Sequence, residues 1–341
     1  YAAVYKILDF SRLLPAPLGT QILRQMGYEV LKIERPQSPD PLRHQFPFME
    51  LPDGQQVSVL YHWLNAGKTP LLLDYADTQE RERLLSEILP DCDVLIEQFR
   101  PQAMARWSLD YEQLRERFPR LIYISVTGYG QDTETWANEA GHDINFLALS
   151  GLLGLLRDDA GKPVMPNFQI ADIAGGAYPL VSAVLHALLQ RERTGKGARI
   201  DINMTRNIAP LMAITLSQQA AGIDAQDLRL LSGGLVNYNI YPTADGKWLA
   251  FAALEMKFWR NFCHHAERPD WQRQQAAELT CAAFDKQQLD EFFRQRTQAE
   301  WTQWALGKDI CLTPVVELAD WFAHSPFAAT FFDEHNAPRW V

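Results

Sequence analysis

The chain has 341 residues, a length that suggests about two domains, each with its own core. Hydrophobic residues make up 47% and charged residues 22% of the sequence, as in ordinary globular proteins. The formal net charge of −10 argues against a nucleic-acid partner, although a local basic patch for a small anion is compatible with it.

No stretch reaches eighteen uninterrupted apolar residues, and the N-terminal segment lacks the charged start and long apolar run of a secretory signal. We therefore expect a cytoplasmic protein without a membrane partner. The four cysteines are scattered without a CxxC pair, so they indicate buried free thiols rather than a disulfide framework or a zinc site.

The first two hundred residues alternate short apolar runs with amphipathic helical patterns. The runs predict strands at 6–10, 29–34, 69–75, 93–99 and 120–130, and the clearest helical patterns cover 17–28 and 108–118. Continuous apolar strands separated by helices are typical of a parallel sheet covered on both faces. The predicted fold class is therefore α/β, with a doubly wound, Rossmann-like large domain over 1–200.

The pattern beyond residue 170 is more helical. Residues 171–197 predict one long buried helix that ends at Gly195 and Gly197, and residues 203–222 predict another helix. The pair Asp245-Gly246 predicts a β-hairpin between two apolar runs. We accordingly expect a linker over 201–232, a small α+β domain over 233–312, and a return segment over 313–341 that joins the large domain.

The stretch "EAGHDINFLALSG", residues 139–151, places a histidine in front of an apolar run. A lone histidine at such a position is more often structural than catalytic. However, Gly141 permits close approach of the backbone, and a helix beginning here would offer unpaired amides, including that of Asp143, to an anion. A developing oxyanion would then lie beside His142, a base that titrates near neutral pH.

Two carboxylates are further candidates. Asp172, in "QIADIAGGA", is either an N-cap of the long helix or a partly desolvated group with a raised pKa, suited to proton transfer or nucleophilic attack. Glu255 closes an apolar run, where it is either a solvated strand end or a group that shares a proton with another carboxyl. The residues alone leave both alternatives open.

Eight segments, in order and spacing, resemble the class III CoA-transferase family, and within it the alpha-methylacyl-CoA racemase branch. They include "DVLIEQFRPQAMARWSLD", "RLIYISVTGYGQ", "AGHDINFLALSG" and "ADIAGGA", and the resemblance extends from about residue 7 to 325. It implies an interlocked homodimer whose subunits each have a large Rossmann-like domain and a small α+β domain.

The resemblance also implies an activity. The transferases share an aspartate that matches Asp172 and attacks a thioester, but they generally lack the histidine that matches His142. With both present, and Glu255 in its racemase position, we expect a racemase or epimerase that inverts the alpha carbon of a 2-methyl-branched acyl-CoA. The alternatives are a CoA-transferase that uses Asp172 as nucleophile, and a non-catalytic CoA-binding protein.

In the racemase reading, His142 and Asp172 flank a planar enolate, the Asp143 amide binds the thioester oxygen, and Glu255 keeps Asp172 protonated. No tightly bound cofactor or metal is expected, and CoA enters as part of the substrate. The residues expected to bind CoA are four basic and two apolar ones, of which Arg35, Arg106, Leu73 and Met104 match family contacts: Arg35, Lys68, Arg100, Arg106, Leu73 and Met104.

Overall fold

The computed structural model describes residues 4–224, 229–275, 285–333 and 337–341. The chain forms two compact units, one of Tyr1–Ala213 with Thr330–Val341 and one of Ile214–Ala329. The division after Ala213 falls inside the expected linker over 201–232. Much of the expected return segment, including α14 (Leu318–His324), belongs to the second unit.

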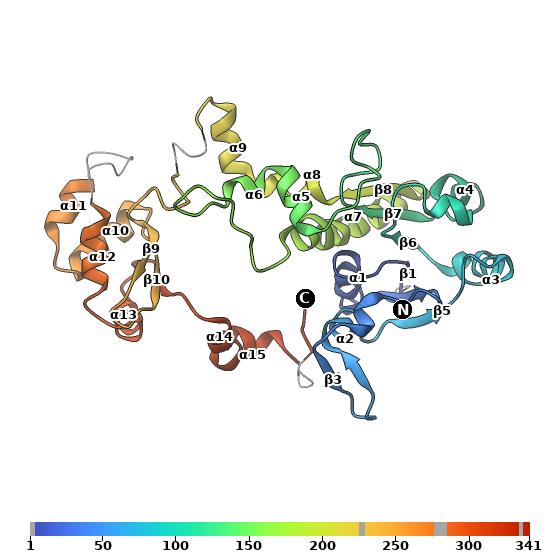
Figure 1. The fold of residues 1–341 in the computed structure, drawn as a ribbon, viewed down its shortest axis with the longest axis horizontal. Coiled ribbons are helices and arrows are strands. Elements are labelled where there is room, and N and C mark those ends of the chain that lie inside the picture. Colours follow the sequence, from blue (N-terminus) through green and yellow to red (C-terminus); the bar gives the residue numbers. More distant parts are fainter. Residues whose placement is uncertain (1–3, 225–228, 276–284, 334–336) are drawn as a thin grey trace. The chain divides into compact units, whose positions relative to one another are not determined.

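A six-stranded parallel sheet is the centre of the first unit, with the strand order β5-β2-β1-β6-β7-β8 (Figure 1). The strands are β1 (Lys6–Asp9), β2 (Glu29–Glu34), β5 (Thr69–Leu72), β6 (Val94–Glu97), β7 (Ile122–Thr127) and β8 (Ala198–Asn203). The order reverses between β1 and β6, as in a doubly wound Rossmann sheet. The predicted α/β fold class is confirmed for this unit.

Apolar side chains leave the sheet on both faces. Ile7, Ile96 and Ile124 pack in one core with helices α1 (Pro15–Gln25) and α7 (Tyr178–Thr194). Leu8, Leu95 and Tyr123, which alternate with them along the strands, pack in a second core. Because both faces are buried, the strands read as continuous apolar runs in the sequence.

The long helix predicted over 171–197 is present, but its first turns, η5 (Ala171–Ala177), are π-helical. It continues as α7 and ends at Gly195, whose φ of 71° suits glycine. The segment 171–194 is long and apolar enough to cross a membrane, and its most apolar stretch of 18 residues has a mean hydropathy of 1.3. Leu180, Val184 and Leu188 are nevertheless buried in the core, and core helices commonly meet the same criteria.

The single helix predicted over 203–222 is wrong. The segment forms α8 (Met204–Asn207), a 3-10 turn η6 (Ala209–Met212) and α9 (Ala213–Ala220). Pro210 explains the break, because its ring excludes the helical hydrogen bond and clashes with the preceding turn.

The second unit has a three-stranded antiparallel sheet in the order β11-β10-β9, formed by β9 (Tyr238–Pro242), β10 (Trp248–Ala252) and β11 (Leu312–Pro314). The hairpin predicted at Asp245-Gly246 is confirmed, with a Gly246 φ of 72°. An aromatic core joins this sheet to α10 (Met256–His265), α12 (Lys286–Phe293) and α13 (Gln298–Ala305), and contains Trp259, Phe262, Trp271, Phe293 and Trp301.

Shorter elements complete both units: η1 (Pro41–His44), β3 (Phe48–Glu50), β4 (Gln56–Ser58), α2 (Val59–Asn65), α3 (Thr78–Arg83), η2 (Leu84–Ile88), η3 (Leu89–Asp91), η4 (Met104–Trp107), α4 (Tyr111–Arg117), α5 (Asp143–Ser150), α6 (Leu152–Leu155), α11 (Pro269–Gln275) and α15 (Pro326–Phe331). Cys92, Cys263 and Cys311 are free thiols, but Cys311 is exposed rather than buried as expected. Cys281 lies outside the described residues.

Candidate active site

A cavity of about 300 Å³ lies beyond the carboxyl ends of β1, β6 and β7. In doubly wound sheets, ligands bind at this edge, where the strand order reverses and the loops diverge. The loops after these three strands, together with α5 and η5, supply its walls, which include Leu13, Pro15, Gln98, Phe99, Arg100, Thr127, Tyr129, Gly141, His142, Phe146 and Asp172.

His142 is the residue before α5, and its exposed side chain lines this cavity. The Asn145 side chain fixes the start of the helix, because its Oδ1 accepts a hydrogen bond from the His142 amide at 3.1 Å. The prediction that a helix begins here is confirmed. The amide of Asp143 is therefore in the first turn, ahead of the helix's own i to i−4 hydrogen bonds.

Gly141 permits a close approach that any larger residue would prevent. A Cβ at this position would lie 2.4 Å from Tyr129 Oη and 2.7 Å from the Phe146 ring. Both aromatic side chains are buried and line the cavity. The glycine thus allows the segment that carries His142 to pack directly on Tyr129.

Asp172 is the second residue of η5, and its side chain lines the same cavity as His142. Its interpretation as an N-cap is wrong, because the Asp172 amide itself donates to Asp143 Oδ1 at 2.8 Å. Asp143 is the carboxylate that holds the start of η5. A single side chain therefore ties the helix that follows His142 to the helix that contains Asp172.

Burial, and secondarily the nearby Asp143 carboxylate, raise the pKa of Asp172 to about 7. Burial also raises the pKa of Asp143, although the amides of Asp172, Ala171 and Ile170 oppose this increase. Asp172 is thus a carboxyl that exchanges a proton near neutral pH, as a general acid or base requires.

Glu255 belongs to the second unit. It is exposed and precedes α10, just after β10 ends. Its predicted interaction with Asp172 remains a prediction.

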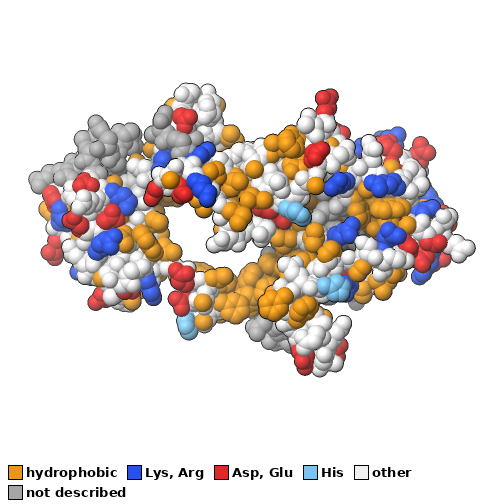
Figure 2. Space-filling view, in the orientation of Figure 1, with side chains coloured by type: hydrophobic (Ala, Val, Ile, Leu, Met, Phe, Trp, Pro, Cys, Tyr) orange, Lys and Arg blue, Asp and Glu red, His pale blue; other side chains and the backbone are white. Residues whose placement is uncertain are grey.

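Among Arg12, Arg35, Arg100 and Arg106, only Arg100 lines the cavity. Arg35 Nε donates to Asp74 Oδ1 at 2.8 Å, and its guanidinium lies 5.6 Å from the Tyr75 ring centre. Arg12, which the sequence did not single out, lies 5.5 Å from the ring centre of Phe99. Arg100 and Arg106 are exposed. Figure 2 shows Lys and Arg side chains around a hydrophobic area on the first unit.

Leu73 and Met104 are 1% and 3% exposed and pack in the second core of the first unit. They leave little of their own surface for a ligand. The aromatic rings of Tyr75, Phe99 and Trp107 pack against one another beside them, with centroids 4.9 to 6.5 Å apart.

Lys68 was expected to contact a CoA phosphate, but its ammonium group is buried inside the protein. Its side chain is 1% exposed, and Nζ donates to four oxygens within the protein. These are Asp9 Oδ2 at 3.3 Å, Pro17 O at 3.0 Å, Thr20 Oγ1 at 2.8 Å and Asn65 Oδ1 at 3.0 Å. The ammonium is occupied inside the fold, so we no longer place Lys68 among the CoA-binding residues.

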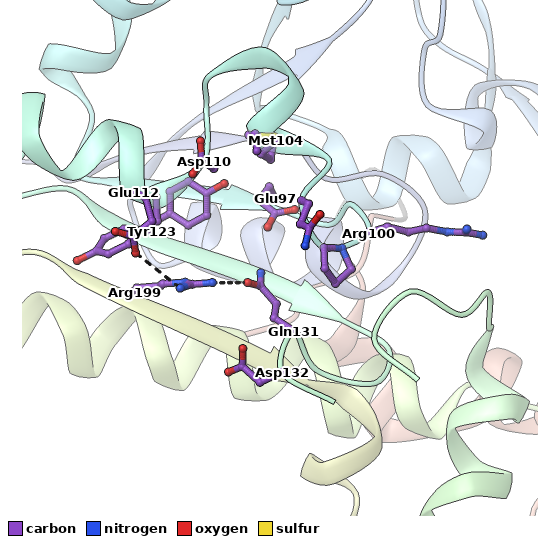
Figure 3. A pocket seen from close by; sticks show the side chains of 13 residues that line it. Glu97, Arg100, Met104, Asp110, Glu112, Tyr123, Gln131, Asp132 and Arg199 are labelled. Carbon is purple, nitrogen blue, oxygen red and sulfur yellow. Dashed lines mark hydrogen bonds and ion pairs between the residues drawn. The ribbon is translucent and has the colours of Figure 1, made fainter. Parts of the chain in front are cut away.

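A second cavity, of about 230 Å³, shares Arg100 and Pro101 with the first (Figure 3). Glu97 is its buried carboxyl, and burial raises the pKa of Glu97 to about 7. Arg199 extends between Gln131 and Glu112, and donates to Gln131 Oε1 at 2.6 Å. Within the part of the chain that the structure describes, no cluster of three His, Cys, Asp or Glu side chains suits a metal ion.

Known proteins are similar to this chain over most of its length. Residues 4–335 match CoA-transferase family III. The human alpha-methylacyl-CoA racemase is 30% identical, over 98% of this chain and 80% of its own. The succinate–glutarate CoA-transferase of Agrobacterium fabrum is 33% identical, over 76% of this chain and 64% of its own.

Solved structures are similar over nearly the whole chain. Rv3272 from Mycobacterium tuberculosis has a TM-score of 0.78 and 26% identity, over 96% of this chain and 86% of its own. A CAIB/BAIF family protein from Brucella suis has a TM-score of 0.79 and 25% identity, over 98% of this chain and 89% of its own.

Proposed function

Because this chain belongs to CoA-transferase family III, we propose that it acts on acyl-CoA thioesters, and specifically that it inverts the alpha carbon of a 2-methyl-branched acyl-CoA. One observation carries the proposal: His142 and Asp172 line a single cavity, while Asp143 links their two helices. A racemase needs two groups that exchange protons with one carbon. A transferase needs the aspartate alone.

The chemistry proceeds by moving one proton at a time. The alpha proton of a thioester is too weakly acidic for a side-chain base acting alone, so the enolate oxygen needs a donor as charge develops. The Asp143 amide, in the first turn of α5, supplies that donor and the positive end of the helix dipole. His142 removes the proton on one face, and Asp172 returns one on the other, with the roles exchanged in the reverse direction.

The raised pKa of Asp172 supports this role. A carboxyl with a pKa of about 7 is protonated in a large fraction of molecules at neutral pH, and therefore serves as the acid in one direction and the base in the other. Glu255, in our proposal, comes close to Asp172 in the assembled enzyme and helps to keep it protonated.

For CoA, we propose four arginines as phosphate contacts. Arg12, Arg35, Arg100 and Arg106 provide guanidinium groups that form paired hydrogen bonds with phosphate oxygens. Tyr75, Phe99 and Trp107 offer aromatic faces for the adenine beside them.

The second candidate is CoA transfer between carboxylic acids. The similarity to the Agrobacterium transferase favours it, since identity to that protein and to the racemase is about the same. In that reaction the Asp172 carboxylate attacks the thioester carbonyl and releases the CoA thiolate, leaving a mixed anhydride. The CoA thiolate then attacks the aspartyl carbonyl of the anhydride and releases the donor carboxylate, which gives an aspartyl-CoA thioester. The acceptor carboxylate attacks this thioester to form a second anhydride, and the CoA thiolate attacks its acyl carbonyl to give the new acyl-CoA and free Asp172.

One experiment separates the two functions. The protein is incubated with a chiral 2-methylacyl-CoA in deuterated water, without any acceptor acid. Deuterium incorporation at the alpha carbon with loss of optical purity supports the racemase. Absence of exchange, with hydroxylamine-sensitive CoA transfer once a free carboxylate is added, supports the transferase. If the protein binds the CoA thioester but catalyses neither reaction, its function is that of a non-catalytic CoA-binding protein.

We also propose the interlocked homodimer and a cytoplasmic location. Tyr178, Leu185 and Leu189 form an exposed apolar face on α7, 40 to 54% exposed, which a second subunit would cover. Light scattering on the purified protein tests the dimer: a monomer at micromolar concentration contradicts it.

A further inference from the structure

Four ionisable side chains are buried in the interior of the first unit. The side chains of Asp9, Lys32, Asp40 and Lys68 are 0 to 1% exposed. We call these four residues the buried ion cluster. Lys68 Nζ lies 3.3 Å from Asp9 Oδ2, and Lys32 Nζ lies 3.5 Å from Asp40 Oδ2. Each amino group of the cluster thus has a carboxyl group as a partner.

Such a cluster contributes little net free energy to the stability of a fold. Removing charges from water costs several kcal/mol per ion, and apolar residues of similar volume often stabilise a protein as well or better. Burial strongly lowers the pKa of Lys68, to about 7, which reflects this cost. The contacts that the cluster makes beyond its own charges therefore indicate its purpose.

Asp9, Lys32 and Asp40 all contact one loop, whereas Lys68 bonds to α1 and α2. The segment 11–14 follows β1 and leads into α1, and Leu13 lines the cavity. Asp9 Oδ1 accepts from the Ser11 amide at 2.8 Å, and Lys32 Nζ donates to Ser11 O. Both Asp40 carboxylate oxygens lie 3.2 Å from the Leu13 amide.

The loop needs such restraint. Leu13 has a φ of 64°, in the left-handed region that side chains other than glycine rarely adopt. On its other side, Gln98 Nε2 donates to Arg12 O at 3.2 Å, and Gln98 Oε1 accepts from Ala16 N at 3.1 Å. The segment is thus fixed between the buried charges below and Gln98, which also lines the cavity.

We infer that the buried ion cluster positions the loop 11–14, and with it one wall of the active-site cavity, so that its residues are positioning residues for the reaction. The inference rests on the proposed function in one respect: that the cavity is where the reaction occurs. The loop also begins α1, which packs against η5, where Gly19 approaches the backbone of Ala177. A displaced loop would therefore disturb both the substrate and Asp172.

Two double variants test this inference. Lys32→Met/Asp40→Leu removes both charges and all acceptors for Leu13 N. Lys32→Met/Asp40→Asn also removes both charges, but the asparagine oxygen still accepts from Leu13 N. We expect the leucine variant to lose roughly tenfold to a hundredfold in kcat for alpha-proton exchange. The asparagine variant loses the Lys32 donor to Ser11 O but keeps an acceptor for Leu13 N, so its kcat should fall by only about threefold, as partial rescue of positioning predicts.

The control is another ion pair in the same unit, between a buried arginine and a partly exposed aspartate. Arg191 Nη2 lies 2.7 Å from Asp93 Oδ1, just before β6, at the end of the sheet away from the cavity. Arg191→Met/Asp93→Asn should lower Tm without lowering kcat. If this control loses as much kcat at equal Tm, or if both Asp40 variants keep wild-type kcat and KM, the positioning role is overturned.

Hydrogen exchange provides a measurement independent of activity. Peptides that cover residues 11–14 should exchange faster in the leucine variant than in the asparagine variant, and equal rates would contradict the inference. If the leucine variant does not fold, Lys32→Met/Asp40→Ser replaces it: serine still caps η1 through Leu42 N, but does not reach Leu13 N. A wild type without either reaction would overturn the proposed function, while the exchange comparison would still test the loop.

Discussion

His142 has the side chain whose removal should affect the chemistry most directly. It is exposed and lines the cavity, so truncating it removes little buried surface. We expect His142→Ala to reduce alpha-proton exchange by about two to four powers of ten, as for loss of a positioned acid or base. Tm should change little.

The comparison variant is His264→Ala, which removes an exposed histidine near the end of α10. It should keep full activity. Equal exchange rates in His142→Ala and the wild type would remove His142 from the mechanism. If His142→Ala loses alpha-proton exchange but keeps CoA transfer, the role of His142 is limited to proton abstraction.

Asp172 should also affect stability as pH changes. Its folded pKa of about 7 lies above that of an exposed aspartate, so between about pH 4 and 7 the folded state binds more protons than the unfolded state. The contribution of Asp172 to the free energy of unfolding is therefore most favourable below pH 4 and is lost as pH rises through 7. Asp172→Asn should become progressively more stable than the wild type over this range.

Urea unfolding at several pH values between 4 and 8 measures this difference. Asp159→Asn, on an exposed loop, serves as the control and should show no comparable trend. A constant difference between Asp172→Asn and wild type across these pH values would show that Asp172 has an ordinary pKa in the folded protein.

The start of α5 depends on the close packing of Gly141 against Tyr129. Gly141→Ala would place a Cβ 2.4 Å from Tyr129 Oη, so either the ring or the His142 backbone must move. Overpacking of this kind costs roughly 1–3 kcal/mol, and a shift of about 1 Å at His142 can cost a hundredfold in rate. We expect both Tm and the exchange rate to fall.

Gly154→Ala is the matched control, because a Cβ there meets only a guanidinium nitrogen, at 4.0 Å. It lies in α6, where alanine is favoured over glycine by about 0.5–1 kcal/mol. Normal exchange in Gly141→Ala would mean that this segment adjusts without moving His142.

The elements that the sequence predicted well are those whose signal is local. The strands of the parallel sheet are buried on both faces, so each reads as an apolar run, and Gly246 marks the hairpin by its left-handed backbone. The helix start after His142 also has a local signal. Pro210 was a local signal too, but it was outweighed by the apolar pattern around it.

The candidate site was only partly predictable, since several of its features depend on contacts between distant residues. Nothing near Lys68 in the sequence reveals that Asp9 lies 3.3 Å from its ammonium. Likewise, Asp143 caps η5 from 29 residues away, which made Asp172 look like the cap. The contact between Arg12 and Phe99 joins the loop after β1 to the loop after β6, which are distant in the sequence, so the sequence does not predict it.

At the scale of the whole molecule, the two units have separate cores, so they should respond separately to a core mutation. Phe262 is fully buried in the second unit. Phe262→Ala should lower the stability of that unit by about 3–5 kcal/mol. Fluorescence would report it through Trp259 and Trp271, which are also fully buried there.

Phe327→Ala is the control, since this side chain is 73% exposed. In urea, the fluorescence transition of Phe262→Ala should shift to lower concentration, while the circular dichroism keeps a later transition from the first unit. A single transition that shifts equally in both signals would show that the units unfold together.

The net charge of −10 and the four arginines proposed to bind CoA should act on CoA over different distances. The Debye length is about 30 Å at 0.01 M salt, 8 Å at 0.15 M and 3 Å at 1 M. Repulsion from the whole protein is therefore screened first, and contacts with phosphate are screened only near 1 M. We expect the KM for acyl-CoA to fall between 0.01 and 0.15 M salt and to rise again towards 1 M.

Arg35→Gln should raise KM by about tenfold, as loss of a charged hydrogen bond predicts, and should flatten the rise in KM towards 1 M salt. Arg83→Gln, on the exposed helix α3, is the control and should change neither KM nor its salt dependence. A KM that rises steadily from the lowest salt concentration would mean that the local arginines outweigh the net charge even at long range.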